Sequence, residues 1–161
     1  MKSLVIYDTT YGNTKTIAET IAETLKGSGL EGDALKVNEV KKLNPKEYGL
    51  LVFGSPTKFG TMSFAMKWFL GKVKGEDWAD KPFVAFDTEN PGNAEKALAE
   101  NKEWSAAEKI AQNLKEKKMN QLLPVLKALV IDQKGPLVDG EIDRAKQYAM
   151  ETATKLSQAT K

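Results

Sequence analysis

The sequence predicts one α/β domain, residues 1–161, built on a doubly wound parallel sheet. Short apolar runs, typical of strands that are buried on both faces, alternate with stretches whose apolar residues recur at helical spacing. Polar loops follow three of these runs. A chain of 161 residues is long enough to bury a sizeable core. We therefore expect about five parallel strands, joined by right-handed crossovers, with helices on both faces of the sheet.

The first half of the chain contains three of the expected strands and two helices. Residues 4–7 predict a buried strand, and the apolar spacing over 14–26 predicts a helix that ends at Gly27. Residues 34–37 predict a short second strand, and 50–53 predict a central third strand. The next helix is marked by the apolar residues Met62, Ala65, Met66, Phe69 and Val73.

The second half continues the same alternation. Residues 82–86 predict a fourth strand, and Asn93 is the expected cap of a short helix over 94–100. Ser105-Ala106-Ala107-Glu108 has the form of a capping box, which predicts a further helix start. The inner face of that helix is expected to be Ala107, Ile110, Ala111 and Leu114.

The last strand and helix complete the pattern. The apolar stretch 122–131 predicts a strand with an irregular start, because Pro124 interrupts it. Asp139 precedes the final helix, whose inward residues are expected to be Ile142, Ala145, Ala149, Ala153 and Leu156.

The composition excludes several kinds of chemistry. The chain has no Cys and no His, which excludes thiol catalysis, disulfides, Cys-ligated clusters and His-ligated zinc. It also lacks the usual general base at neutral pH. The balance of 24 basic and 22 acidic residues leaves +2, too small to indicate nucleic acid or a membrane surface as a partner. With no signal peptide and no apolar run of membrane length, we expect a cytoplasmic protein.

The stretch Asp8-Thr9-Thr10-Tyr11-Gly12-Asn13-Thr14 joins the first strand to the first helix. The free backbone N–H groups and the positive dipole end of a helix start favour an anion, above all a phosphate. The hydroxyls of Thr9, Thr10 and Thr14 add neutral donors for such a ligand. The alternative is an ordinary turn in which Thr14 only caps the helix.

Two further polar loops, 54–60 and 87–92, follow the third and fourth strands. Ligands of doubly wound folds bind beyond the carboxyl ends of the strands, near the switch in strand order. Because 8–14, 54–60 and 87–92 all follow strands, we expect them to meet at one edge and to form one site.

These three loops resemble those of the flavodoxin family. Thr9-Thr10-Tyr11-Gly12-Asn13-Thr14 is similar to the loop that wraps the FMN phosphate, although Tyr11 stands where flavodoxins more often have Thr. Gly54-Ser55-Pro56-Thr57-Lys58-Phe59-Gly60 resembles the second flavin loop, and with the residues after it looks closer to WrbA-type NAD(P)H:quinone oxidoreductases. Asp87-Thr88 matches the start of the third flavin loop. The resemblance covers nearly the whole chain and implies strand order 2-1-3-4-5.

The resemblance also implies FMN as a non-covalent cofactor, with no metal and no catalytic side chain. The phosphate would be held by Thr9, Thr10, Tyr11, Gly12, Asn13 and Thr14. The flavin ring would be edged by Ser55, Pro56, Thr57, Lys58, Phe59 and Gly60. Its pyrimidine side would be lined by Asp87, Thr88, Glu89 and Asn90. Phe59 is the expected aromatic contact, the alternative being a loop anchor packed on the domain.

Two functions from other classes are excluded, because the residues that their chemistry needs are missing. A receiver domain of two-component signalling needs a phosphoacceptor Asp after the third strand, where this chain has Gly54-Ser55-Pro56. A low-molecular-weight tyrosine phosphatase needs a Cys nucleophile, and the chain has none.

Two flavin functions remain, and a one-electron carrier between a reductase and an electron-accepting protein is the favoured one. The alternative is an FMN-dependent NAD(P)H:quinone oxidoreductase of the WrbA type. It is the less favoured function because WrbA-type enzymes are longer and build part of their site from neighbouring subunits. A cation at Lys58 near the flavin would favour that enzyme, because it stabilises a negatively charged reduced ring. The alternative is a Lys58 side chain that extends into water. Phe64 and Trp68, four residues apart, are a candidate homodimer or partner surface.

Overall fold

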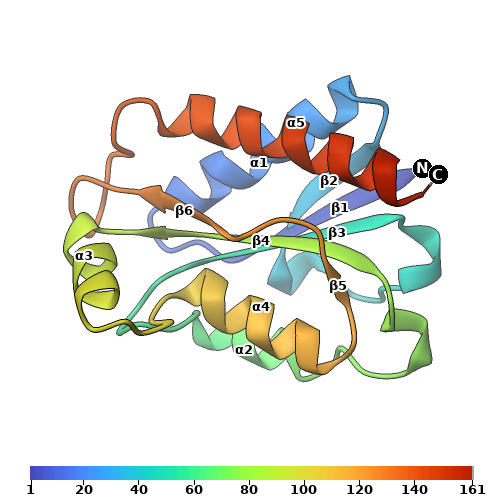
Figure 1. The fold of residues 1–161 in the computed structure, drawn as a ribbon, viewed down its shortest axis with the longest axis horizontal. Coiled ribbons are helices and arrows are strands. Elements are labelled where there is room, and N and C mark those ends of the chain that lie inside the picture. The colour runs from blue at the N-terminus through green and yellow to red at the C-terminus, as the bar shows by residue number, and fades with distance from the viewer. Residues whose placement is uncertain (161) are drawn as a thin grey trace.

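The centre of the fold is a six-stranded parallel sheet, seen in a computed structural model that describes residues 1–160 (Figure 1). The strands lie in the order β2 (Glu31–Lys36), β1 (Lys2–Tyr7), β3 (Leu50–Pro56), β4 (Pro82–Glu89) and β5 (Asn120–Gln121), with β6 (Leu126–Leu129) also paired to β4. This order confirms the predicted 2-1-3-4-5 arrangement. The switch in order lies between β1 and β3, where such folds bind ligands.

Helices cover both faces of the sheet, as predicted (Figure 1). One face carries α1 (Asn13–Gly27) and α5 (Glu141–Ala159), and the other carries α2 (Phe64–Leu70) and α4 (Ala106–Glu116). Another helix, α3 (Pro91–Ala99), follows β4 beyond the carboxyl edge of the sheet. Three 3₁₀ turns lie in the connections, η1 (Val37–Glu39), η2 (Pro45–Glu47) and η3 (Glu76–Trp78). Among residues 1–160, no helix combines the length and apolar character needed to cross a membrane.

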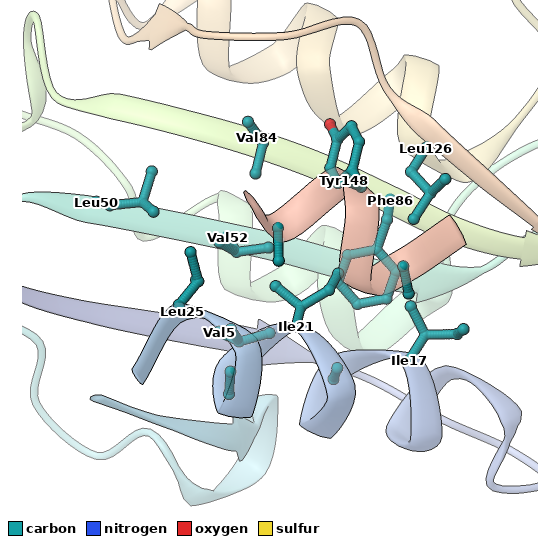
Figure 2. Close-up of a cluster of buried hydrophobic side chains, with 14 of the residues drawn as sticks. Val5, Ile17, Ile21, Leu25, Leu50, Val52, Val84, Phe86, Leu126 and Tyr148 are labelled. Carbon is teal, nitrogen blue, oxygen red and sulfur yellow. The ribbon is translucent and has the colours of Figure 1, made fainter. Parts of the chain in front are cut away.

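The central strands bury both of their faces, which explains their continuous apolar runs. Successive side chains of a strand point to opposite faces, so Leu4 and Ile6 belong to the core under α2 and α4, while Val5 belongs to the core under α1 and α5. Figure 2 shows this second core, where Val52, Val84 and Phe86 of the strands meet the helix residues Ile17, Ile21 and Leu25 of α1 and Tyr148 of α5.

The last strand is broken in two, and Pro124 lies in the break. Proline has no N–H to donate to the ladder, which is why the start of this strand is irregular, as predicted. Both pieces pair with β4: Asn120 lies opposite Pro82, and Leu126 lies opposite Phe86. The Tyr148 hydroxyl of α5 donates to the Pro124 carbonyl at 2.7 Å, which holds the break against the helix layer.

Several predicted boundaries are wrong. Ser55 and Pro56 belong to β3, and Asp87, Thr88 and Glu89 belong to β4, although both stretches were predicted to be loops. The reason is parallel pairing, Ser55 with Asp87 and Pro56 with Thr88, which carries both strands past their apolar residues.

The start of α3 also differs from the prediction. Its cap is Asn90, whose Oδ1 accepts a hydrogen bond from the Asn93 N–H at 2.8 Å, so the helix begins at Pro91. Proline suits the first position of a helix because its φ is already helical and its missing N–H would have no partner there.

Candidate functional site

A cavity of about 420 Å³ lies at the carboxyl edge of the sheet. This volume falls within the range of about 300–1,000 Å³ that small-molecule sites occupy. The walls come from four segments, at or just after the ends of β1, β3, β4 and β6. They are formed by Thr9, Thr10, Tyr11, Asn13, Thr14, Pro56, Thr57, Lys58, Phe59, Thr88, Glu89, Asn90, Val130 and Gln133.

The first wall is the turn between β1 and α1. Gly12 has φ +96°, a conformation that favours glycine, and its N–H donates to Thr9 Oγ1 at 3.0 Å. The turn leads directly into α1, whose first turn contains no acidic residue. The first N–H groups of a helix have no partners within it, so this end of the cavity is suited to an anion.

Thr14 joins the first wall to the third. Its side chain is buried, and its hydroxyl shares a hydrogen bond of 2.7 Å with the hydroxyl of Thr88 on β4. The residue that precedes α1 is Gly12, and no side chain caps the helix. The alternative reading, in which Thr14 only caps α1, is therefore wrong.

The second wall is the hairpin turn after β3. Lys58 and Thr61 exchange backbone hydrogen bonds of 2.9 and 3.1 Å, and the two residues between them, Phe59 and Gly60, have φ of +51° and +76°. Positive φ at both central positions is typical of a type I′ turn. The Phe59 side chain is 97% exposed, so it is not a loop anchor packed on the domain. It lines the cavity instead.

Trp104, in the segment between α3 and α4, holds this turn in place. Its indole N–H donates to the carbonyl of Phe59 at 3.1 Å, and its ring lies so close to Gly60 that an added Cβ would overlap it at 1.5 Å. The Lys96 ammonium lies 4.7 Å from the centre of the same ring, and Asn93 Nδ2 donates to the Trp104 carbonyl. Trp104 was not among the predicted site residues, because nothing in a single tryptophan indicates a contact made 45 residues away.

The third wall is the end of β4, where Thr88 and Glu89 lie on the strand and Asn90 follows it. Asp87 lies one residue further back and is fully buried, so it is not on the surface of the cavity. Burial, together with the negative charge of Glu89, raises the pKa of Asp87 well above its usual range.

The fourth wall, Val130 and Gln133, was missed as part of the site. Asn13 Nδ2 donates to the Lys134 carbonyl at 3.1 Å, which ties this segment to the first wall. Gly135, at φ +101°, gives Asn13 room, because an added Cβ would lie 2.7 Å from its side-chain amide. The available signal was position: this segment also follows a strand that pairs with β4.

Of the sixteen residues that the flavodoxin resemblance assigned to the site, twelve line the cavity and four do not. The Ser55 hydroxyl faces the protein, where it accepts from the Ser63 N–H at 2.9 Å and donates to the Pro56 carbonyl at 2.9 Å. The others away from the cavity surface are Gly12, Gly60 and Asp87.

The family model described as Flavodoxin matches residues 5–155, nearly the whole chain. The chain belongs to the flavodoxin family. A flavodoxin from Aquifex aeolicus is 41% identical over 83 residues, which cover 49% of this chain and 43% of that relative. The NAD(P)H dehydrogenase (quinone) of Gluconacetobacter diazotrophicus is 30% identical over 94 residues, 46% of this chain and 47% of the relative. The chain thus matches less than half the length of both curated relatives.

Among solved structures, a flavodoxin from the domain Archaea superposes with a TM-score of 0.79 at 26% sequence identity. The superposition covers 98% of this chain and 99% of the archaeal one.

Proteins of the flavodoxin family bind FMN, and the donor set of this chain fits that cofactor. The helix start that faces the cavity carries no acidic residue in its first turn, and the hydroxyl-bearing Thr9, Thr10 and Thr14 line the cavity beside it. These are neutral donors for a phosphate. Within residues 1–160, no group of three or more Asp, Glu, His or Cys side chains is arranged to hold a metal ion.

Proposed function

We propose that this protein carries single electrons between two redox partner proteins on FMN held without a covalent bond. Bound FMN supplies a ring that accepts and returns electrons, while the protein binds the cofactor, orients it and tunes it. The observation that carries the proposal is the position of the cavity. Its mouth is bordered by Tyr11, 48% exposed, and Phe59, 97% exposed, so a partner protein can approach its contents.

The proposed roles of the walls follow from their chemistry. The phosphate is assigned to the first wall, because the free helix N–H groups and the hydroxyls of Thr9, Thr10 and Thr14 lie there. The ring is assigned to the space between Phe59 and the end of β4, where Pro56 and Thr57 add apolar and hydroxyl-bearing surface. Ser55, Gly12 and Gly60 shape these walls through the backbone and do not offer side chains to the ligand.

An FMN-dependent NAD(P)H:quinone oxidoreductase is the second candidate, and Lys58 favours it. Lys58 lines the cavity, so its ammonium can stabilise negative charge on a bound ring. Such stabilisation favours uptake of a hydride and opposes the low potential that suits an electron carrier.

The experiment that tests the proposal begins with the visible spectrum of the purified protein, with FMN added where it emerges colourless. We expect flavin bands or quenching of added FMN fluorescence; the absence of both would contradict FMN binding. Anaerobic titration with NADPH, alone and with a quinone, then separates the two functions. A carrier leaves the flavin bands unbleached by NADPH, whereas rapid turnover with quinone identifies the oxidoreductase.

The partner surface is proposed at Phe64 and Trp68 on α2. Their side chains are 79% and 66% exposed, and the rings stack with centres 6.5 Å apart and an interplanar angle of 27°. A stacked, exposed aromatic pair is typical of a surface that another protein covers. Sedimentation at high protein concentration tests the case in which that protein is a second copy. A monomer for both the wild type and Trp68→Ser excludes the homodimer.

A further inference from the structure

Two acidic side chains lie buried together at the end of β4. Asp87 and Glu89 are two residues apart on one strand, so they point to the same face of the sheet, toward α4. Their exposed fractions are 0% and 2%. Glu89 lines the cavity, and Asp87 lies behind it. Neither is part of the apolar core that the rest of this strand face builds.

The hydrogen bonds that reach these two carboxyls leave half of their oxygens without partners. Asp87 Oδ2 accepts from the Ala107 N–H at 3.0 Å, and Glu89 Oε2 accepts a long bond of 3.4 Å from the Thr57 hydroxyl. Asp87 Oδ1 and Glu89 Oε1 are buried and have no hydrogen-bond partner. An ionised carboxylate that is buried in this way is strongly destabilised, unless it is paired or takes up a proton.

Cations on the neighbouring elements do not pair with them. The Lys127 ammonium on β6 lies 3.7 Å from the Glu108 carboxylate of α4, and the Lys134 ammonium lies 6.0 Å from the centre of the Tyr11 ring. Lys58 lines the same cavity, but within residues 1–160 no salt bridge reaches Asp87 or Glu89.

Two uncompensated charges this close do not both persist. Burial and the charge of Glu89 both favour the protonated form of Asp87 and raise its pKa well above the usual range. A proton on Asp87 removes one of the two buried charges and with it the repulsion between the carboxyls.

We propose that Asp87 and Glu89 form a proton-binding site beneath the cavity, which holds one proton at neutral pH and binds it more tightly when negative charge enters the cavity. The second half of this statement rests on the proposed electron-carrier function. An electron delivered by a reduced partner protein adds one negative charge next to Glu89. Where the pair has lost its proton, a carboxylate oxygen then takes one proton from a hydronium ion or a buffer acid, forms an O–H bond and leaves water or the buffer base. In that pH range, uptake of one electron is accompanied by uptake of up to one proton; where the pair already holds its proton, no further proton is taken up.

The first half is tested on the protein without cofactor, by infrared absorption of the protonated carboxyl C=O group in H₂O and D₂O. We expect one such band at neutral pH, shifted by deuterium and lost at higher pH. The band should disappear in Asp87→Asn, and in Glu89→Gln it should be lost at a lower pH, because burial of Asp87 persists while the repulsion from Glu89 is removed. Glu108→Gln is the matched control, since it removes a carboxylate of α4 that is paired with Lys127, and it should keep the band. No band in the wild type at neutral pH overturns the proposal.

The second half is tested on the FMN-loaded protein, by measuring the ratio of reduced to oxidised protein at fixed potential across the pH range of the infrared titration. Proton uptake by the pair changes that ratio by up to about tenfold per pH unit, beyond any change the flavin itself contributes. We expect Asp87→Asn to lose this extra dependence and Glu108→Gln to keep it. An identical pH dependence in all three proteins overturns the coupling. Failure to bind FMN would reject the electron-carrier function and this second half, while the infrared result would still decide the first.

Discussion

The indole N–H of Trp104 donates a hydrogen bond of 3.1 Å to the carbonyl of Phe59, at the tip of the turn that forms the second wall of the cavity. Phe59 holds a left-handed conformation that is unfavourable for a side chain of its size, with φ +51°. The contact therefore stabilises a strained turn from outside, through a segment that does not line the cavity.

Replacing Trp104 with Phe should loosen this turn. The change keeps an aromatic ring but removes the donor, and a neutral hydrogen bond contributes about 0.5–1.5 kcal/mol, so we expect cofactor affinity to fall about two- to tenfold. Because the turn is assigned to the ring, the fold-loss should be the same for FMN and for riboflavin, measured by fluorescence quenching. A loss confined to FMN would mean that Trp104 acts on the phosphate end.

Replacing Thr14 with Val tests the opposite end of the cavity. The variant keeps the volume but removes the hydroxyl that bonds to Thr88 and lies in the proposed phosphate wall. We expect about tenfold weaker binding of FMN and a much smaller change for riboflavin, by the same hydrogen-bond energy. Thr20→Val is the control, because its hydroxyl bonds within α1 to the Thr16 carbonyl. Equal losses for the two ligands would remove Thr14 from the phosphate site.

Gly54 tests the packing of the sheet. A Cβ added there would lie 2.0 Å from Cζ of Phe86, whose ring is fully buried. Overpacking of a well-filled core costs about 1–3 kcal/mol, so Gly54→Ala should lower the free energy of unfolding by that amount in urea denaturation. Gly27→Ala, at the end of α1 with open space around it, should leave stability unchanged or slightly higher. Equal stabilities for the two variants would contradict the packing at Gly54.

Stability should depend on pH through Asp87. Its pKa in the folded protein is raised, so between the ordinary value near 3.8 and that raised value the folded state binds more protons than the unfolded state. The free energy of unfolding then falls as pH rises through this window, and the stabilisation is fully present only below it. Asp87→Asn should flatten the fall, which urea denaturation at a series of pH values measures. A parallel pH profile in both proteins would show that Asp87 is not the group responsible.

The strand and helix alternation was predictable because it depends on local apolar spacing. Short apolar runs such as 4–7 and 50–53 were predicted as buried strands because they alternate with helical stretches. The strand order was predicted from the family resemblance. Strand ends were less predictable. Ser55 and Asp87 are polar, yet they lie inside strands, because they pair with each other between β3 and β4. Their side chains also accept hydrogen bonds from the N–H groups of Ser63 and Ala107.

The site was predictable where consecutive residues build a wall and not where distant segments meet. The residue types of the turn 9–14 favoured an anion-binding wall, and five of its six residues line the cavity. Trp104, which holds the Phe59 turn, and Gln133, which lines the cavity, could not be assigned, because the paths of the connections after α3 and β6 depend on tertiary packing. The sequence also could not predict that one oxygen each of Asp87 and Glu89 is buried without a hydrogen-bond partner, because burial depends on tertiary packing and not on residue type.

The break at Pro124 also affects how the molecule meets other molecules of its kind. The last position of a sheet presents a row of free N–H and C=O groups, which can recruit a strand from another chain and start aggregation. Here that position is divided into pieces of two and four residues, with a proline between them. Neither piece is long enough to offer a continuous template. The same interruption that gives the last strand its irregular start therefore protects this border of the sheet from self-association.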